Sequence, residues 1–169
     1  HGFQTFRRQV HLNNWLAENG YLALKPGLSK SNKDNLGFVD WKNTKAYALG
    51  LGFIYLNLEG REPQGIVEPS QYETVRNELI AKLEAAPGPD GTPLGTKVLK
   101  PQDVYPEVNG VAPDLIVYFG DLAWRSVGSV GNRSIYTYEN DTGPDGANHD
   151  RNGVFAMAEI AVVSSRKAR

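Results

Sequence analysis

The chain has 169 residues, enough for a single domain that buries its own hydrophobic core without stabilising cross-links. Its 18 Lys and Arg residues balance 19 Asp and Glu residues to a net charge of −1, so no basic field is present to attract a nucleic-acid polymer. The absence of cysteine excludes a disulfide framework, a thiol nucleophile and a thiolate metal site. No apolar run approaches the roughly 18–20 residues of a membrane span, so we expect no membrane partner, and the compartment stays open.

The N-terminal region predicts a helix over residues 10–19. Leu12, Trp15 and Leu16 recur at helical spacing on one face, and Gly20 is well placed to end the helix. A short strand and then a polar, turn-rich loop are expected next, over residues 21–24 and 25–40.

Four apolar, β-prone stretches predict the strands of a sheet. They cover residues 46–52, 53–58, 96–99 and 114–119. The stretch over residues 53–58 has almost no polar alternation, which is typical of a strand covered on both faces.

The clearest predicted helix follows the second of these strands. Ser70 and Glu73 form the Ser-x-x-Glu pattern of a capping box, in which each side chain satisfies a free backbone N–H of the other residue. Apolar residues then share one helical face as far as Pro87 and Gly88, which stop the helix. The residues of this face are Tyr72, Val75, Leu79, Ile80 and Leu83.

A section rich in Gly, Asp and Asn, over residues 120–152, leads to a last predicted strand over residues 153–160. Such long connections often carry function. Buried strands mixed with amphipathic helices predict an α/β fold, layered α/β/α around a mixed, mostly buried sheet. We expect one domain over residues 1–163 and a frayed basic tail over residues 164–169.

Few residues are candidates for chemistry. His11, inside the first predicted helix, suits a packing or surface role. His149 lies in a glycine-rich loop directly before the last predicted strand, where open α/β sheets place ligands; a solvated loop histidine is the alternative. Arg61, in a glycine-flanked turn, suits either a clamp for phosphate or a tie within the loop beside Glu59 and Glu62.

Other site classes find little support. Asp141, Asp145 and Asp150 suggest a calcium site, but the spacing of an EF-hand is missing. The chain also lacks the Gly-x-Ser-x-Gly elbow, the phosphate-binding P-loop and the His-Glu-x-x-His pattern.

Read together, several segments resemble a known family. His1-Gly2-Phe3 is similar to the end of the Asp-His-Gly motif of the alkaline phosphatase superfamily, and His149-Asp150-Arg151-Asn152-Gly153-Val154-Phe155 is similar to its late histidine segment. The intervening segments that match are residues 10–22, 40–47, 54–62 and 112–115. The resemblance is to the C-terminal portion of the type I phosphodiesterase/nucleotide pyrophosphatase-like branch, a group of predicted phosphohydrolases and phosphomutases.

The resemblance implies an enzyme with two divalent metal ions, zinc or manganese, that activate a Thr or Ser nucleophile and hold the phosphate. By position, His1 matches a ligand of one metal and His149 a ligand of the other. The family's nucleophile and early aspartate ligands belong to an N-terminal half that has no counterpart in this sequence. We therefore expect the chain alone to be inactive and not to bind both metals.

The functional expectation is a C-terminal fragment of a metal-dependent phosphoester hydrolase or phosphodiesterase that acts on a small phosphorylated substrate, with Arg61 as a candidate substrate contact. The alternative is a non-catalytic α/β binding or structural module, and a third hypothesis is an unrelated binding module whose similarity is accidental. The choice among monoester, diester and pyrophosphate substrates stays open, as does the oligomeric state.

Overall fold

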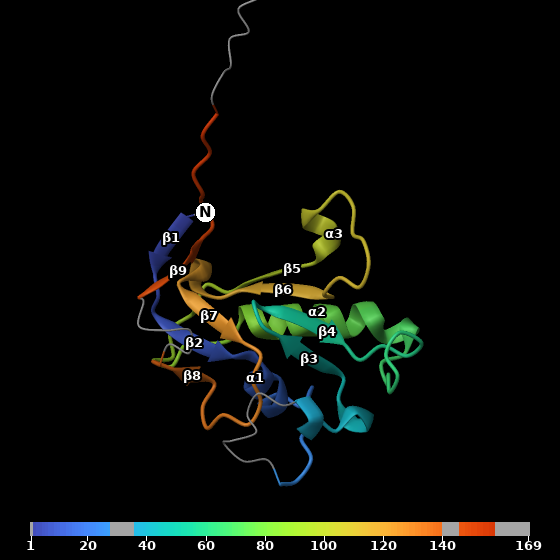
Figure 1. Ribbon diagram of the computed structural model, residues 1–169. Coiled ribbons are helices and arrows are strands. Elements are labelled where there is room, and N and C mark those ends of the chain that lie inside the picture. Colours follow the sequence, from blue (N-terminus) through green and yellow to red (C-terminus); the bar gives the residue numbers. More distant parts are fainter. Residues whose placement is uncertain (1, 28–35, 140–145, 158–169) are drawn as a thin grey trace, which may run out of the picture.

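The computed structural model describes residues 2–27, 36–139 and 146–157 (Figure 1). Its strands are β1 (Gly2–Thr5), β2 (Arg8–His11), β3 (Ala46–Leu49), β4 (Phe53–Leu56), β5 (Lys97–Leu99), β6 (Leu115–Tyr118), β7 (Trp124–Val127), β8 (Tyr136–Thr137) and β9 (Ala147–Asp150). Its helices are α1 (Leu12–Glu18), α2 (Tyr72–Glu84) and α3 (Pro101–Val104). Short 3-10 turns are η2 (Leu36–Phe38), η3 (Trp41–Asn43), η4 (Pro69–Gln71) and η5 (Gly120–Leu122).

The largest sheet has the strand order β3-β4-β6-β5, and all its neighbours are antiparallel. This confirms the four strands predicted from the apolar stretches. The β3–β4 hairpin turns through Gly52, which has φ +80 and lies so close to β6 that a Cβ there would meet the carbonyl oxygen of Val117 at 2.3 Å. A glycine is therefore needed at this turn.

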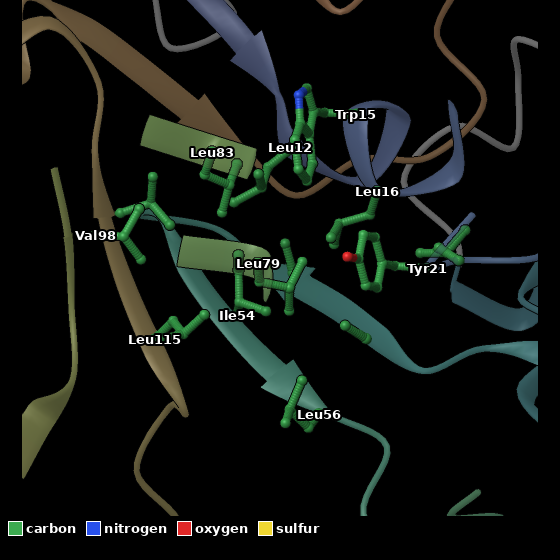
Figure 2. Close-up of a cluster of buried hydrophobic side chains, with 14 of the residues drawn as sticks. Leu12, Trp15, Leu16, Tyr21, Ile54, Leu56, Leu79, Leu83, Val98 and Leu115 are labelled. Atoms are coloured by element: carbon green, nitrogen blue, oxygen red, sulfur yellow. The ribbon is translucent and has the colours of Figure 1, made fainter. Parts of the chain in front are cut away.

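The two faces of this sheet differ. One face, together with α1 and α2, forms the hydrophobic core (Figure 2). The buried side chains on this face of the sheet are Ala46, Ala48, Ile54, Leu56, Val98, Leu115 and Val117. Leu12 and Leu16 of α1 and Leu79 and Leu83 of α2 pack against them, each 0% exposed.

The opposite face carries half-buried aromatic side chains. The rings of Tyr47 and Tyr55 stack with their centroids 5.6 Å apart, and Trp41 meets Tyr47 edge-on at 5.0 Å. The prediction that residues 53–58 are covered on both faces is therefore wrong, because β4 alternates between buried and half-buried residues. The described residues confirm a mixed α/β fold, and the layered α/β/α arrangement stays a prediction.

A second sheet has the order β7-β2-β8, with β2 parallel to β7 and antiparallel to β8. Strand β2 runs directly into α1, so the first predicted helix begins at Leu12 and not at Val10. Two of the strands in this sheet, β7 and β8, lie in the section over residues 120–152 that was expected to be a long connection.

The predicted helix from residue 72 is confirmed, but its capping box is wrong. The 3-10 turn η4 precedes α2, and the Ser70 hydroxyl donates to the Glu68 carboxylate at 3.2 Å. Glu73 instead accepts from Arg76 and Lys100, at 2.7 and 2.8 Å. The polar partners of these side chains thus come from outside the first turn.

Two smaller predictions also differ from the structure. The expected strand over residues 21–24 is reduced to an isolated bridge between Leu24 and Val39. The last predicted strand is wrong over the described residues 153–157, which are exposed and form no strand, while residues 158–160 and the tail lie outside the described part. Within the described ranges, no helix is long and apolar enough to cross a bilayer.

Candidate functional site

The two ends of the described chain meet in an antiparallel ribbon, β1 with β9 (Figure 1). Its register pairs Gly2 with Asp150 and Phe3 with His149. The residue after His1 thus lies directly beside the residue after His149, although 148 positions separate Gly2 from Asp150 in the chain. His1 itself lies outside the described residues.

His149 is exposed on this ribbon, and its ring stacks on Phe3 with the centroids 5.8 Å apart and 24° between the planes. The expectation that His149 sits at the mouth of a deep strand starting near Gly153 is wrong. The histidine lies within a two-stranded ribbon, because its polar neighbours pair with β1 rather than leading into an apolar strand.

The opposite side of the ribbon holds a tight turn. Three successive residues of η5, Gly120, Asp121 and Leu122, have φ values of 54, 54 and 70, a left-handed conformation that is costly for a branched side chain such as Leu122. The Gln4 amide donates to the Asp121 carbonyl at 2.7 Å, and the Asn148 amide donates to the Leu122 carbonyl. Side chains of β1 and β9 therefore fix the strained turn.

A cavity of about 970 Å³ adjoins the ribbon and the turn. Its lining includes Gln4 from β1, Arg7 and Arg8 around the start of β2, and Gly120 and Trp124 at the turn. Two arginines in the lining make this cavity a candidate site for an anion.

Arg61 has a different environment from the one expected of a substrate clamp. Its two terminal nitrogens donate to the two carboxylate oxygens of Asp114, at 2.9 and 2.7 Å, and one of them also donates to the Leu56 carbonyl at 2.6 Å. Asp114, with its carboxylate beside Arg61, raises the pKa of this arginine. Arg61 thus ties its loop to the sheet, which is the other interpretation of its sequence position.

Asp114 is the centre of this buried polar cluster, at 2% exposure. It also accepts hydrogen bonds from the Leu56 amide at 2.6 Å and from the Tyr72 hydroxyl at 2.5 Å. Burial, followed by the hydrogen bond to Asp114, raises the pKa of Tyr72 to about 12. The cluster joins α2, β4, β6 and the Arg61 loop.

His11 is buried at 5% exposure, at the end of β2. Its Nε2 lies 3.0 Å from the Thr137 hydroxyl and its Nδ1 lies 3.4 Å from the Ser129 hydroxyl. This agrees with a packing role.

The described residues do not meet the requirements of a two-metal site on their own. Among them, no group of three or more His, Asp or Glu side chains converges as metal ligands would. For calcium, Asp141 and Asp145 lie outside the described part, and the Asp150 carboxylate accepts from the backbone amide of Asn152 at 2.8 Å. A metal held by His149 would need ligands from beyond the described residues.

Two features of the site were missed by sequence reasoning. Asp114 precedes an apolar strand, and a lone carboxylate at the start of a buried strand is a signal that it needs a cationic partner. Arg8 stands next to Arg7 in a short polar segment, and nothing local indicates that aromatic residues 116 and 130 positions later surround it.

Comparison of the chain with protein-family models, with curated proteins and with solved structures found no match.

Proposed function

We propose that this chain is part of a metal-dependent phosphoester hydrolase, in which the described residues bind a small phosphorylated substrate in the cavity next to the ribbon that carries His149. One observation carries the proposal. The pairing of β1 with β9 brings Gly2, which follows one histidine of the resemblance, against Asp150, which follows the other. Ligands of two metals about 3.5–4 Å apart must converge in this way.

The cavity beside the ribbon supports the phosphate part of the proposal. Arg7 and Arg8 line it, and a phosphate ester carries the charge that two guanidinium groups recognise. The metal part rests on the resemblance alone, with His1 and His149 as one ligand each for zinc or manganese. Such an ion would supply charge stabilisation at the phosphate, while the chain's own residues bind and orient the ester.

The proposal includes the α/β/α layering. The aromatic face of the large sheet, with Tyr47 and Tyr55 half-buried, is the surface on which a second layer would pack. A layer packed on that face would give the α/β/α arrangement expected from the resemblance to the alkaline phosphatase superfamily.

A non-catalytic binding module is the second candidate function. It is favoured by the cavity together with the lack of a converging metal-ligand group among the described residues. Such a module would bind phosphate esters without hydrolysing them.

The two functions are separated by assaying the chain extended with the coding sequence that precedes His1. The first function predicts an Asp directly before His1, a Ser or Thr nucleophile farther upstream, and hydrolysis of p-nitrophenyl phosphate or its bis-ester with added zinc or manganese. An extended protein that folds, binds phosphate and hydrolyses neither ester would overturn the enzyme proposal.

A further inference from the structure

Arg8 is held by aromatic rings in a way that leaves its hydrogen-bond donors open to the cavity. Its guanidinium carbon lies 3.8 Å from the ring centroid of Tyr138 and 5.6 Å from that of Trp124. These contacts use the face of the guanidinium, whereas its N–H groups point outward in the plane. Among the described residues, none accepts a hydrogen bond from the Arg8 side chain.

Trp124, the more distant of the two rings against Arg8, packs against the turn at Gly120. Gly120 has φ +54, and a Cβ there would lie 2.3 Å from Cδ1 of the Trp124 indole. The indole therefore lies against bare backbone, and Tyr136 meets its edge with the ring centroids 5.7 Å apart. The next two residues of the turn, Asp121 and Leu122, have φ +54 and +70, and backbone strain of this kind is typically kept where it positions a functional group.

The charge of the cavity favours an anion. Arg7 and Arg8 face one carboxylate in the lining, that of Asp90, which leaves an excess of one positive charge. Thr92 donates to Asp90 through its hydroxyl and its amide, at 2.7 and 3.1 Å, and these hydrogen bonds lower the pKa of Asp90. Asp90 therefore stays ionised and acts as an acceptor at one side of the cavity.

The size and lining of the cavity indicate more than a bare anion. A volume of about 970 Å³ lies at the upper end of the range for small-molecule sites, far larger than one phosphate group. Thr5, Asp90 and Thr92 offer hydroxyl and carboxylate oxygens on the lining. These are the groups that recognise the hydroxyls of a ligand.

We propose that this cavity binds the phosphate monoester of a small polyhydroxylated molecule. The guanidinium groups of Arg7 and Arg8 donate hydrogen bonds to the phosphate. The side-chain oxygens of Thr5, Asp90 and Thr92 form hydrogen bonds with the hydroxyls of the ligand. The choice of phosphate as the anion rests on the proposed function. The aromatic rings of Trp124 and Tyr138 act as positioning residues for Arg8.

Calorimetric titration of the chain without added metal tests this site, using glucose 6-phosphate, inorganic phosphate and glucose as probes. We expect glucose 6-phosphate to bind at least about tenfold more tightly than inorganic phosphate, and glucose alone not to bind. Arg8→Gln should weaken glucose 6-phosphate binding by about 10–100-fold, the range for a charge-assisted hydrogen bond. Arg8→Lys should weaken it less, and Tyr138→Leu by about threefold, through loss of the stacked geometry.

Arg133→Gln is the matched control, because Arg133 is exposed and lies outside the cavity lining. An Arg8→Gln protein that binds like Arg133→Gln would overturn the site, and equal affinities for inorganic phosphate and glucose 6-phosphate would overturn the ligand class. Because no turnover is measured, failure here is distinct from failure of the enzyme proposal. Binding lost in Arg8→Gln supports the site even where the extended protein hydrolyses nothing.

Discussion

Asp114 and Arg61, 53 positions apart, form a bidentate ion pair in which each carboxylate oxygen accepts one N–H of the guanidinium. The Asp114 side chain is 2% exposed and that of Arg61 26%. The pair joins the turn after β4 to the start of β6, beside Tyr72 of α2. It is a structural tie at one end of β4 and β6, the two central strands of the large sheet.

Asp114→Asn should lower the free energy of unfolding by about 3 kcal/mol, because it removes the buried charge that accepts from Arg61 and Tyr72 and leaves Glu62 as the carboxylate beside Arg61. Urea unfolding followed by far-UV circular dichroism measures the effect. Glu107→Gln, at an exposed position, is the control and should change stability by less than about 0.5 kcal/mol. Equal stability of the two variants would show that the pair contributes nothing to the fold.

Tyrosine titration should make the fold lose stability at alkaline pH. Burial and the contact with Asp114 raise the pKa of Tyr72 to about 12, and burial and the Glu62 charge raise the pKa of Tyr47 to about 12. In the unfolded chain a tyrosine loses its proton near pH 10. Between these values the folded state holds more protons, so the free energy of unfolding falls as the pH rises from about 10 to 12.

The contribution of Tyr72 is isolated by measuring the free energy of unfolding of Tyr72→Phe over the same pH range. This variant has lower stability at neutral pH, since it lacks the hydrogen bond to Asp114, but its stability should fall less steeply above pH 10. Urea midpoints at several pH values give both slopes. Parallel curves for the two proteins would contradict the assigned role of Tyr72.

Two glycines with similar backbone angles allow the cost of a left-handed backbone to be measured apart from the cost of a steric clash. Gly120 has φ +54 and Gly110 has φ +67, but a Cβ would meet Trp124 at the first and open space at the second. Gly110→Ala should cost about 1 kcal/mol of stability, the expense of a left-handed alanine. Gly120→Ala should cost more and shift the tryptophan fluorescence, because the indole must move. Indistinguishable spectra for the two variants would contradict the contact.

The chain alone should hydrolyse neither p-nitrophenyl phosphate nor its bis-ester, with or without zinc or manganese. Among the described residues no group of three or more His, Asp or Glu side chains converges, and the nucleophile that the resemblance implies belongs to a half with no counterpart in this sequence. The visible absorbance of the released p-nitrophenolate measures turnover. Turnover that survives His149→Ala would show that the chemistry lies elsewhere.

The parts of the fold that rest on local pattern could be predicted from the sequence. The strands from Ala46 to Tyr118 and helix α2 follow from apolar periodicity, which decides which residues leave water. Strands β7, β8 and β9 could not, because their residues are polar or glycine-flanked and become strands through partners far away in the chain. The same reason explains the false strand from Gly153, whose apolar residues have no partner among the described residues.

The candidate site divides in the same way. The glycine-rich loop indicates His149 as a candidate from sequence, and in the structure its ring stacks on Phe3 at the ribbon. The pairing of Asp114 with Arg61 and the rings around Arg8 depend on contacts across the fold, which a single sequence does not display. The strained turn was also not evident from the sequence, since Leu122 has φ +70 although a branched side chain disfavours positive φ.

The most direct test of the proposed function is kcat/KM for phosphate ester hydrolysis by the extended protein, wild type against His149→Ala, at saturating zinc. We expect a loss of about a hundredfold or more in His149→Ala, because His149 is the proposed ligand of one metal, and no loss in the exposed control Arg133→Gln. Unchanged kcat/KM in a folded His149→Ala protein would contradict the role of His149 and with it the central claim.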